Sequence, residues 1–189
     1  MESILELENL LANTRLPINR YRRNVLQKGD TYYCGVTLGL VRHFYTRNYS
    51  FSVKLKRKKY ENVFKKAVKL CNSTLPDFRF TTIQINESYK MAKHVDSNNG
   101  GVSNIIGIGD YTGGELLIYY EGPDKPPTPV DIKHKFFEFD GGKYYHEVAE
   151  FTGTRITLVY YNCFPEDVSN YLIHGIRQPV GTKSDQFQY

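Results

Sequence analysis

Residues 93–103 read Lys-His-Val-Asp-Ser-Asn-Asn-Gly-Gly-Val-Ser, and this stretch decides how the chain is interpreted. Within it, His94 and Asp96 are separated by a single residue. On a strand or at its end, side chains two positions apart leave the same face, so an imidazole and a carboxylate lie side by side. Such a pair is a usable set of two metal ligands. The alternative is an ordinary polar pair at a strand end, since both residue types are common on surfaces.

A second histidine far along the chain would complete a ligand set. His146 lies in the strand-like run 144–148, about three predicted strands after Asp96. Strands that far apart can be neighbours in a folded sandwich, so the spacing is geometrically plausible. Two imidazoles and one carboxylate leave open positions on a ferrous ion. We therefore predict that His94, Asp96 and His146 bind Fe(II). The other histidines, His43, His134 and His174, fit no ligand pattern.

A candidate anion site follows shortly after His146. Arg155 and Thr157 are also two positions apart, which points them to the same face of a strand. A guanidinium fork beside a hydroxyl is a good cradle for a carboxylate. The sequence thus offers three metal ligands and a separate anchor for an organic acid.

The composition is that of one folded domain. A chain of 189 residues with 40% apolar and 14% aromatic side chains is large enough for a real core. Its cysteines, Cys34, Cys71 and Cys163, are odd in number and lack CxxC spacing, which argues against a disulfide framework or a structural zinc site. We expect reduced thiols in an intracellular protein of the nucleus or cytoplasm.

The sequence shows no targeting or membrane segment. Its first residues lack the basic and apolar regions of a signal peptide. No run reaches the ~20 apolar residues that a membrane span needs. We expect a protein that is neither secreted nor bound to a membrane.

Charge is divided unevenly along the chain, whose net charge is +5. Residues 1–93 contain 18 Lys and Arg against 7 Asp and Glu, whereas residues 94–189 contain 7 against 13. A basic half beside an acidic half suggests a surface that faces a polyanion next to a metal-binding core, although the charge can equally serve solubility. Residues 15–28 combine five cations with Tyr21: Arg15, Arg20, Arg22, Arg23 and Lys28. Such a segment can line a phosphate track with a stacking ring, or be a solvated loop, which we favour.

The pattern of the sequence changes near residue 80. Before it, residues 2–12 predict a short helix or a capping segment, and 31–45 predict a strand. A second helix, followed by Pro76, places its apolar side chains at helical spacing: Tyr60, Val63, Phe64, Ala67, Val68 and Cys71. We expect this helix to lie against one face of a sheet.

Short strands separated by Gly and Pro clusters follow, which is typical of a β-sandwich or barrel. They are roughly 80–86, 103–109, 114–121, 129–139, 144–151 and 154–162. The prediction is one α+β domain over residues 1–189. Within it, residues 1–79 are helical and basic, 80–162 form the β core, and 163–189 form a tail that starts with a helix near Pro165 and ends polar.

In the order His-x-Asp, His, Arg-x-Thr, the sequence resembles the double-stranded β-helix dioxygenases that use Fe(II) and 2-oxoglutarate. Further matches are similar to the TET/J-binding-protein branch, which oxidises 5-methylpyrimidines in nucleic acid. The likeness covers about residues 80–162. Besides the five residues above, the matching positions are Gln84, Asn86, Asn99, Gly101, Ser103, Gly109, Gly113, Gly114, Glu115, Leu116, Phe139, Asp140, Gly141, Thr152, Gly153 and Thr154.

The resemblance implies a jelly-roll core and a role for each matching site residue. It assigns Fe(II) to His94, Asp96 and His146. It assigns the distal carboxylate of 2-oxoglutarate to Arg155 and Thr157, with Asn86 also contacting this cosubstrate, and O₂ as the other cosubstrate. Asn99 matches a position that hydrogen-bonds the target base. Gly113 and Gly114 more simply serve a tight turn.

The chain also departs from its apparent relatives. It lacks the cysteine-rich zinc region of the animal TET enzymes, which leaves the nucleic acid open. Alkylation-repair dioxygenases carry a second arginine six residues after the first, where this chain has Tyr161, and prolyl 4-hydroxylases use Lys at the position of Arg155.

The function that the resemblance implies is hydroxylation of the methyl group of 5-methylcytosine or thymine in nucleic acid, with DNA expected before RNA. The basic N-terminal part would contact phosphates. Two alternatives stay open. One is an oxygenase of the same cofactor class that acts on a protein side chain, a free nucleoside or a small molecule. The other is a non-catalytic nucleic-acid-binding module on the same fold.

Overall fold

The structure is a computed structural model that describes residues 2–42 and 49–163. Helix α1 (Glu2–Ala12) and the long helix α2 (Lys58–Thr74) occupy the positions predicted from the sequence. Short 3₁₀ turns lie at η1 (Arg23–Val25) and η2 (Val53–Lys56). The predicted tail beyond Cys163 lies outside the described residues, and so do His43 and His174.

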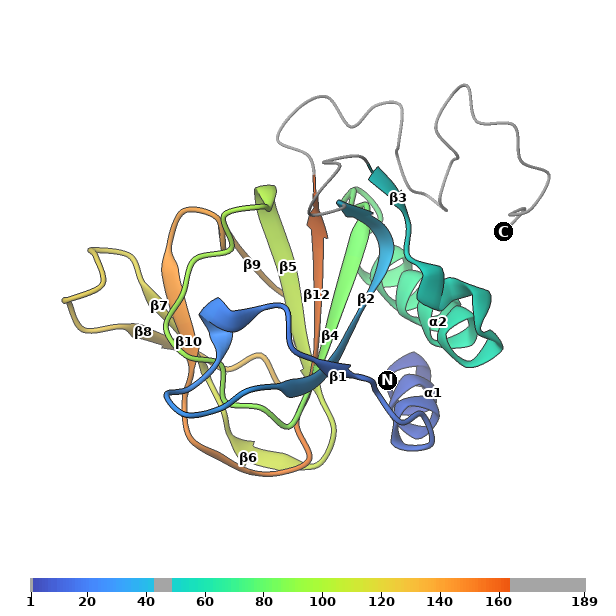
Figure 1. Cartoon of the computed structure of the whole chain (residues 1–189), viewed down its shortest axis with the longest axis horizontal. Helices are drawn as coiled ribbons and strands as arrows, with labels where there is room; N and C mark the ends of the chain where they lie inside the picture. The colour runs from blue at the N-terminus through green and yellow to red at the C-terminus, as the bar shows by residue number, and fades with distance from the viewer. Residues whose placement is uncertain (1, 43–48, 164–189) are drawn as a thin grey trace.

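A large antiparallel sheet forms the middle of the molecule (Figure 1). Its spatial order is β1 (Ile18–Asn19), β2 (Tyr33–Arg42), β4 (Thr82–Glu87), β12 (Ile156–Asn162), β5 (Gly100–Ile108) and β9 (Phe137–Phe139). Strand β3 (Tyr49–Phe51) pairs with β2. The last strand in sequence, β12, is therefore inserted between β4 and β5 in the centre of the sheet.

A smaller sheet faces the large one on the side away from the helices (Figure 1). It has the order β10 (Tyr145–Val148), β7 (Leu116–Tyr119) and β8 (Thr128–Val130). Strands β6 (Tyr111–Gly113) and β11 (Phe151–Gly153) form a separate ribbon. Buried side chains from both sheets pack together: Ile105, Leu116, Ile118, Ile132 and Phe139.

The helices cover the outer face of the large sheet, as predicted for a helix laid against a sheet. The buried stripe of α2 consists of Tyr60, Val63, Phe64, Ala67, Leu70 and Cys71. It differs from the predicted stripe at two places, because Leu70 is buried and Val68 is only half-buried. The hydroxyl of Tyr160 on β12 donates a hydrogen bond to the Ala67 carbonyl at 3.0 Å, which ties the helix to the sheet.

Alternation along the central strands separates the two faces of the large sheet. In β4, Ile83 and Ile85 belong to the core under the helices, so the residue between them, Gln84, and the next, Asn86, point to the inner face. In β12, Leu158 belongs to the helix-side core, and Thr157 points inward. This alternation brings buried polar side chains to the space between the sheets.

Two predicted strands prove to be divided. The predicted strand 129–139 consists of β8 and β9, because a turn interrupts it. In that turn, the Lys133 N–H donates to the Asp131 carboxylate and His134 has φ +58°. The predicted strand 144–151 is likewise β10 followed by the start of β11. The first third, predicted to be helical apart from one strand, also adds β1 and β3 beside β2.

The predicted α+β class is confirmed, with two facing antiparallel sheets and helices on one outer face. Neither described helix is long and apolar enough to cross a membrane.

Candidate metal centre

Two histidines from distant parts of the chain pair directly through their backbones. The His94 N–H donates to the His146 carbonyl at 3.0 Å, and the His146 N–H donates to the His94 carbonyl at 2.9 Å. His146 lies on β10, so the bridge places His94 at the edge of the smaller sheet. Their ring centroids are 4.3 Å apart.

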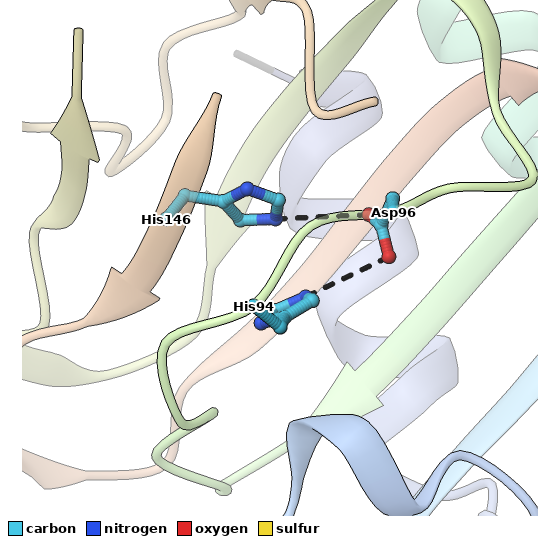
Figure 2. A group of neighbouring side chains, drawn as sticks. All are labelled: His94, Asp96 and His146. Atoms are coloured by element: carbon cyan, nitrogen blue, oxygen red, sulfur yellow. Dashed lines mark ion pairs between the residues drawn. The ribbon is translucent and has the colours of Figure 1, made fainter. Parts of the chain in front are cut away.

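The Asp96 carboxylate completes the group (Figure 2). Its Oδ1 lies 3.6 Å from His94 Nε2, and its Oδ2 lies 3.7 Å from His146 Nε2. One ligand atom from each of the three residues lies within 4.8 Å of the other two. The predicted set of two imidazoles and one carboxylate thus converges on a shared point, as a metal ion requires.

Backbone carbonyls orient both rings. The Ala92 carbonyl lies 2.6 Å from His94 Nδ1, and the Tyr144 carbonyl lies 2.9 Å from His146 Nδ1. Because a carbonyl only accepts, Nδ1 carries the proton in each ring and the Nε2 lone pair faces the shared point. Burial lowers the pKa of His94 to about 4, so this ring is neutral at pH 7. Neutral imidazole is the form that binds a metal.

Arg22 reaches this group from the N-terminal segment. Its Nη2 donates to Asp96 Oδ1 at 2.6 Å, and its side chain is 28% exposed. Burial alone would raise the pKa of Asp96, but the Arg22 guanidinium and the two imidazoles outweigh it and hold this pKa below its usual range. A carboxylate has two oxygens, so Asp96 can accept from Arg22 with one and face an ion with the other.

The sequence did not reveal this role, because Arg22 stands in a basic run interpreted as a solvated loop. That interpretation is wrong for Arg22, since its carboxylate partner keeps it in the site. Its neighbours Arg20, Tyr21 and Arg23 are exposed, as a loop predicts.

Arg155 forms the second part of the site and is only 3% exposed. Its Nε donates to the Gly114 carbonyl at 3.0 Å, and its guanidinium carbon lies 5.6 Å and 5.7 Å from the ring centroids of Tyr111 and Phe151. Its Nη2, however, is buried without a hydrogen-bond partner. The hydroxyl of Tyr111 is buried and unpartnered too. Unpaired buried donors are costly, so this place is suited to an anion.

The turn at Gly113 and Gly114 makes room for Arg155. Both glycines have positive φ, +76° and +74°, which agrees with the predicted tight turn. A Cβ on Gly114 would lie 2.8 Å from Cδ and Nε of Arg155. Gly114 therefore serves the site as well as the turn.

A chain of hydrogen bonds runs along the inner face to Thr157. Gln84 Nε2 donates to Asn86 Oδ1 at 2.9 Å, and Asn86 Nδ2 donates to Thr157 Oγ1 at 3.3 Å. Since Thr157 accepts here, its hydroxyl hydrogen is left to donate to a ligand.

One pocket between the two sheets contains both parts of the site. Its polar lining consists of Arg22, Asn86, His94, Asp96, His146, Glu147, Arg155 and Thr157. The apolar lining is Met91, Ile105, Leu116, Phe139, Val148 and Val159. All of the residues predicted to bind metal or cosubstrate thus line a single cavity.

Asn99 is the one predicted site residue that does not line this pocket. Its N–H donates to the Asp96 carbonyl at 3.0 Å, and its side-chain Nδ2 donates to Ser103 Oγ at 3.3 Å. It is therefore close to Asp96 along the chain, and its contact with a target base stays a prediction.

Solved structures share this architecture, although no protein-family model and no curated protein matches the chain. A 2OG-Fe(II) oxygenase family oxidoreductase from Burkholderia pseudomallei is 16% identical with a TM-score of 0.52, over 84% of this chain and 76% of that one. OsALKBH1 is 11% identical with a TM-score of 0.52, over 85% and 91%. NgTET1 in complex with 5mC DNA is 15% identical with a TM-score of 0.52, over 85% and 66%.

The chain has the jelly-roll fold of the 2OG-Fe(II) oxygenases. At these identities the likeness establishes the fold, and the assignment of individual residues depends on the geometry described above. The predicted double-stranded β-helix core is thereby confirmed.

Proposed function

We propose that this protein is an Fe(II)- and 2-oxoglutarate-dependent oxygenase that hydroxylates the methyl group of a 5-methylpyrimidine in nucleic acid. One observation carries the cofactor class. A single pocket holds two imidazoles, each with its Nδ1 on a backbone carbonyl, and a carboxylate at one place, and a buried arginine with an unpartnered Nη2 at another. The first group suits a ferrous ion and the second suits the carboxylate of an organic acid.

His94, Asp96 and His146 would hold the ion through two Nε2 atoms and one carboxylate oxygen. When bound, iron and its cosubstrate supply the oxidising chemistry that converts a C–H bond to an alcohol. In the overall balance, one oxygen atom of O₂ enters the substrate and the other enters succinate, while 2-oxoglutarate loses CO₂. The three protein ligands leave the remaining positions of the ion open for this exchange.

Arg155 and Thr157 would anchor the distal carboxylate of 2-oxoglutarate. Arg155 offers the unpartnered Nη2, and Thr157 offers its free hydroxyl hydrogen. Asn86 fixes the Thr157 hydroxyl from the neighbouring strand. Apolar side chains of both sheets, among them Ile105 and Leu116, close the pocket around these groups and exclude water.

Two features support nucleic acid as the substrate. Residues 1–93 carry a large excess of cations, which favours contact with phosphates. Among the solved structures that share the fold, NgTET1 is in complex with 5mC DNA. A methylated base must leave the stack to enter a pocket that lies between two sheets, at a cost of a few kcal/mol in a duplex.

The test is mass spectrometry of 5-methylcytosine- and thymine-containing DNA and RNA after incubation with the protein, ferrous iron and 2-oxoglutarate. We expect a hydroxymethylpyrimidine and at least an equal amount of succinate. His146→Ala should abolish both, because it removes a predicted metal ligand. His134→Ala is the matched control, since His134 is an exposed histidine that pairs with Glu8 and does not line the pocket.

The other outcomes separate the alternatives. Succinate release without an altered base would assign the protein to oxygenases of another substrate. Binding of nucleic acid without any succinate would indicate a non-catalytic module. Full turnover by His146→Ala would refute the ligand assignment.

A further inference from the structure

The segment before η1 has two sides with different surroundings. Arg22 points inward to Asp96 and lines the pocket. The residues on either side, Arg20, Tyr21 and Arg23, are exposed. Since adjacent Cα atoms are only ~3.8 Å apart, these outward side chains start one or two residues from a side chain that touches a predicted metal ligand.

Tyr21 is 96% exposed, more than any other large apolar side chain among the described residues. Its backbone is nevertheless held, because its N–H donates to the Asn19 carboxamide oxygen at 3.0 Å. Asn19 in turn lies in β1, which pairs with β2 of the large sheet. The ring is therefore a free aromatic face on an anchored backbone.

The charges beside this ring are all positive. Ile18, Arg20, Tyr21 and Arg23 line one open hollow on the surface. None of the ion pairs formed between described residues involves Arg20 or Arg23. Arg20 instead lies over the ring of Tyr32, with its guanidinium carbon 5.9 Å from the centroid. Along the chain, no acidic residue occurs between Glu8 and Asp30.

We propose that Arg20, Tyr21 and Arg23 form a docking surface for single-stranded nucleic acid. This inference rests on the proposed function. It specifies which surface binds the nucleic acid and that the bound nucleic acid is single-stranded. A base stacks on Tyr21 and the two arginines contact the phosphates on either side. Every base has a π face, so such a ring accepts any sequence. An acidic peptide would use the arginines and leave the ring without a role.

The position of this surface beside Arg22 gives it a function in catalysis. A strand held on Tyr21 would lie one residue along the chain from Arg22, which lines the pocket. An unpaired base in that strand reaches the pocket without the cost of leaving a duplex. The docking surface would thus select unpaired substrate.

The test is fluorescence anisotropy with labelled DNA and RNA single strands of about 12 nucleotides, and with the corresponding duplexes. Tyr21→Ala should weaken single-strand binding about 5- to 150-fold, the range measured for loss of one stacked base, and Tyr21→Phe should restore it. Arg20→Gln with Arg23→Gln should reduce the slope of log affinity against log salt by about 1.4. Duplexes should bind more weakly than single strands.

The control removes two charges elsewhere. Lys65→Gln with Lys69→Gln neutralises two exposed lysines of α2, which covers the opposite face of the large sheet. If this control weakens binding as much as the arginine pair, or if Tyr21→Ala binds like the parent, the proposal is wrong. Equal displacement of the oligonucleotide by poly-glutamate of equal charge would also overturn it.

Succinate release in the absence of nucleic acid keeps the two proposals distinct. Tyr21→Ala should retain this uncoupled turnover at the parental rate, because the Tyr21 side chain is 96% exposed and does not line the pocket. Loss of oligonucleotide binding with turnover retained supports the docking surface. Absence of succinate from the parent even when methylated nucleic acid is present refutes the proposed function, whereas the binding comparison still decides the surface.

Discussion

Arg155 is a buried cation whose hydrogen bonds are incomplete. Its Nε bonds to the Gly114 carbonyl and two aromatic rings lie beside it, but its Nη2 has no acceptor. Burial also lowers the pKa of its guanidinium. A buried guanidinium with an unpaired donor does not stabilise a protein. The arrangement is best explained by an anionic ligand that accepts the missing hydrogen bond from Nη2.

Replacing this side chain should therefore separate stability from binding. We expect Arg155→Met to weaken 2-oxoglutarate binding by at least about 30-fold, as loss of a buried charge pair predicts. The free protein should unfold at the same or a higher temperature, because the desolvation cost of the guanidinium disappears. Calorimetric titration with 2-oxoglutarate in the presence of Mn²⁺, and thermal melts, measure the two effects. Arg57→Met, at an exposed arginine, should change neither.

Arg22 acts through Asp96 and is best described as a positioning residue. We expect Arg22→Gln to reduce metal affinity about 10- to 100-fold, the range seen when an outer partner of a ligand is removed. Anaerobic titration with Fe²⁺ gives the affinity directly. Arg23→Gln is a matched control, since Arg23 is the exposed neighbour of Arg22. Equal affinities for the parent and Arg22→Gln would show that Asp96 needs no such partner.

The site residues differ in how far the sequence revealed them. His94 and Asp96 were predicted as a pair from their two-residue spacing, His146 as a distant histidine in a strand-like run, and Arg155 and Thr157 because they repeat that spacing. Arg22 could not, since it has the same type as its exposed neighbours and meets Asp96 across 74 positions. Tyr111 was missed for a similar reason, because a tyrosine between Asp110 and Thr112 gives no sign that its hydroxyl is buried and unpartnered.

Among the elements, the turn that joins β6 to β7 connects fold and site. Its two glycines adopt positive φ, and Gly114 borders the Arg155 side chain. Backbone strain and side-chain contact thus occur at one position.

The effect of backbone strain at Gly114 can be separated from the effect of its contact with Arg155 by comparing alanine substitutions at two glycines. We expect Gly114→Ala to destabilise the protein by about 1–3 kcal/mol and to lower 2-oxoglutarate affinity, because the new Cβ meets Cδ and Nε of Arg155. Gly122→Ala should show only the loss of stability, since Gly122 has φ +120° and open space where a Cβ would lie. Denaturant melts and calorimetric titration of both variants check this. Unchanged 2-oxoglutarate affinity in Gly114→Ala would contradict the proposed contact.

Local signals predicted the elements better than their pairing. Helical spacing located α2, and only Leu70 and Val68 were misjudged, each beside a correctly assigned residue. The division of 129–139 depends on Asp131 and His134 in a turn that the run of strand-forming residues concealed. Pairing of β2 with β4 joins segments over 40 residues apart, which no local pattern reports.

For the molecule as a whole, the charges of the pocket balance only while its candidate metal position is empty. Arg22 and Arg155 line the pocket opposite two carboxylates, Asp96 and Glu147, so a ferrous ion would leave an excess of two positive charges. A dicarboxylate such as 2-oxoglutarate would offset this excess, and the ion would in turn strengthen binding of the anion.

We accordingly expect metal and 2-oxoglutarate to bind cooperatively. Thermal melts of the parent with neither, each or both should show a larger shift with both than the sum of the separate shifts, since a ligand that binds only the folded state stabilises it. Mn²⁺ can stand in for iron, and EDTA should reverse the effect. His146→Ala should lose the combined shift. Purely additive shifts in the parent would argue against a shared pocket.

The central place of β12 governs how a growing polypeptide acquires this architecture. Strands β4 and β5 each leave the ribosome well before residues 156–162, yet both must hold β12 between them. Until translation passes that point, the nascent sheet has an open slot at its middle, with backbone donors and acceptors on both sides unpaired. Synthesis that stalls before Ile156 would release a product whose unpaired strand edges can pair with other chains and aggregate. We expect chaperones to bind the protein chiefly at that stage.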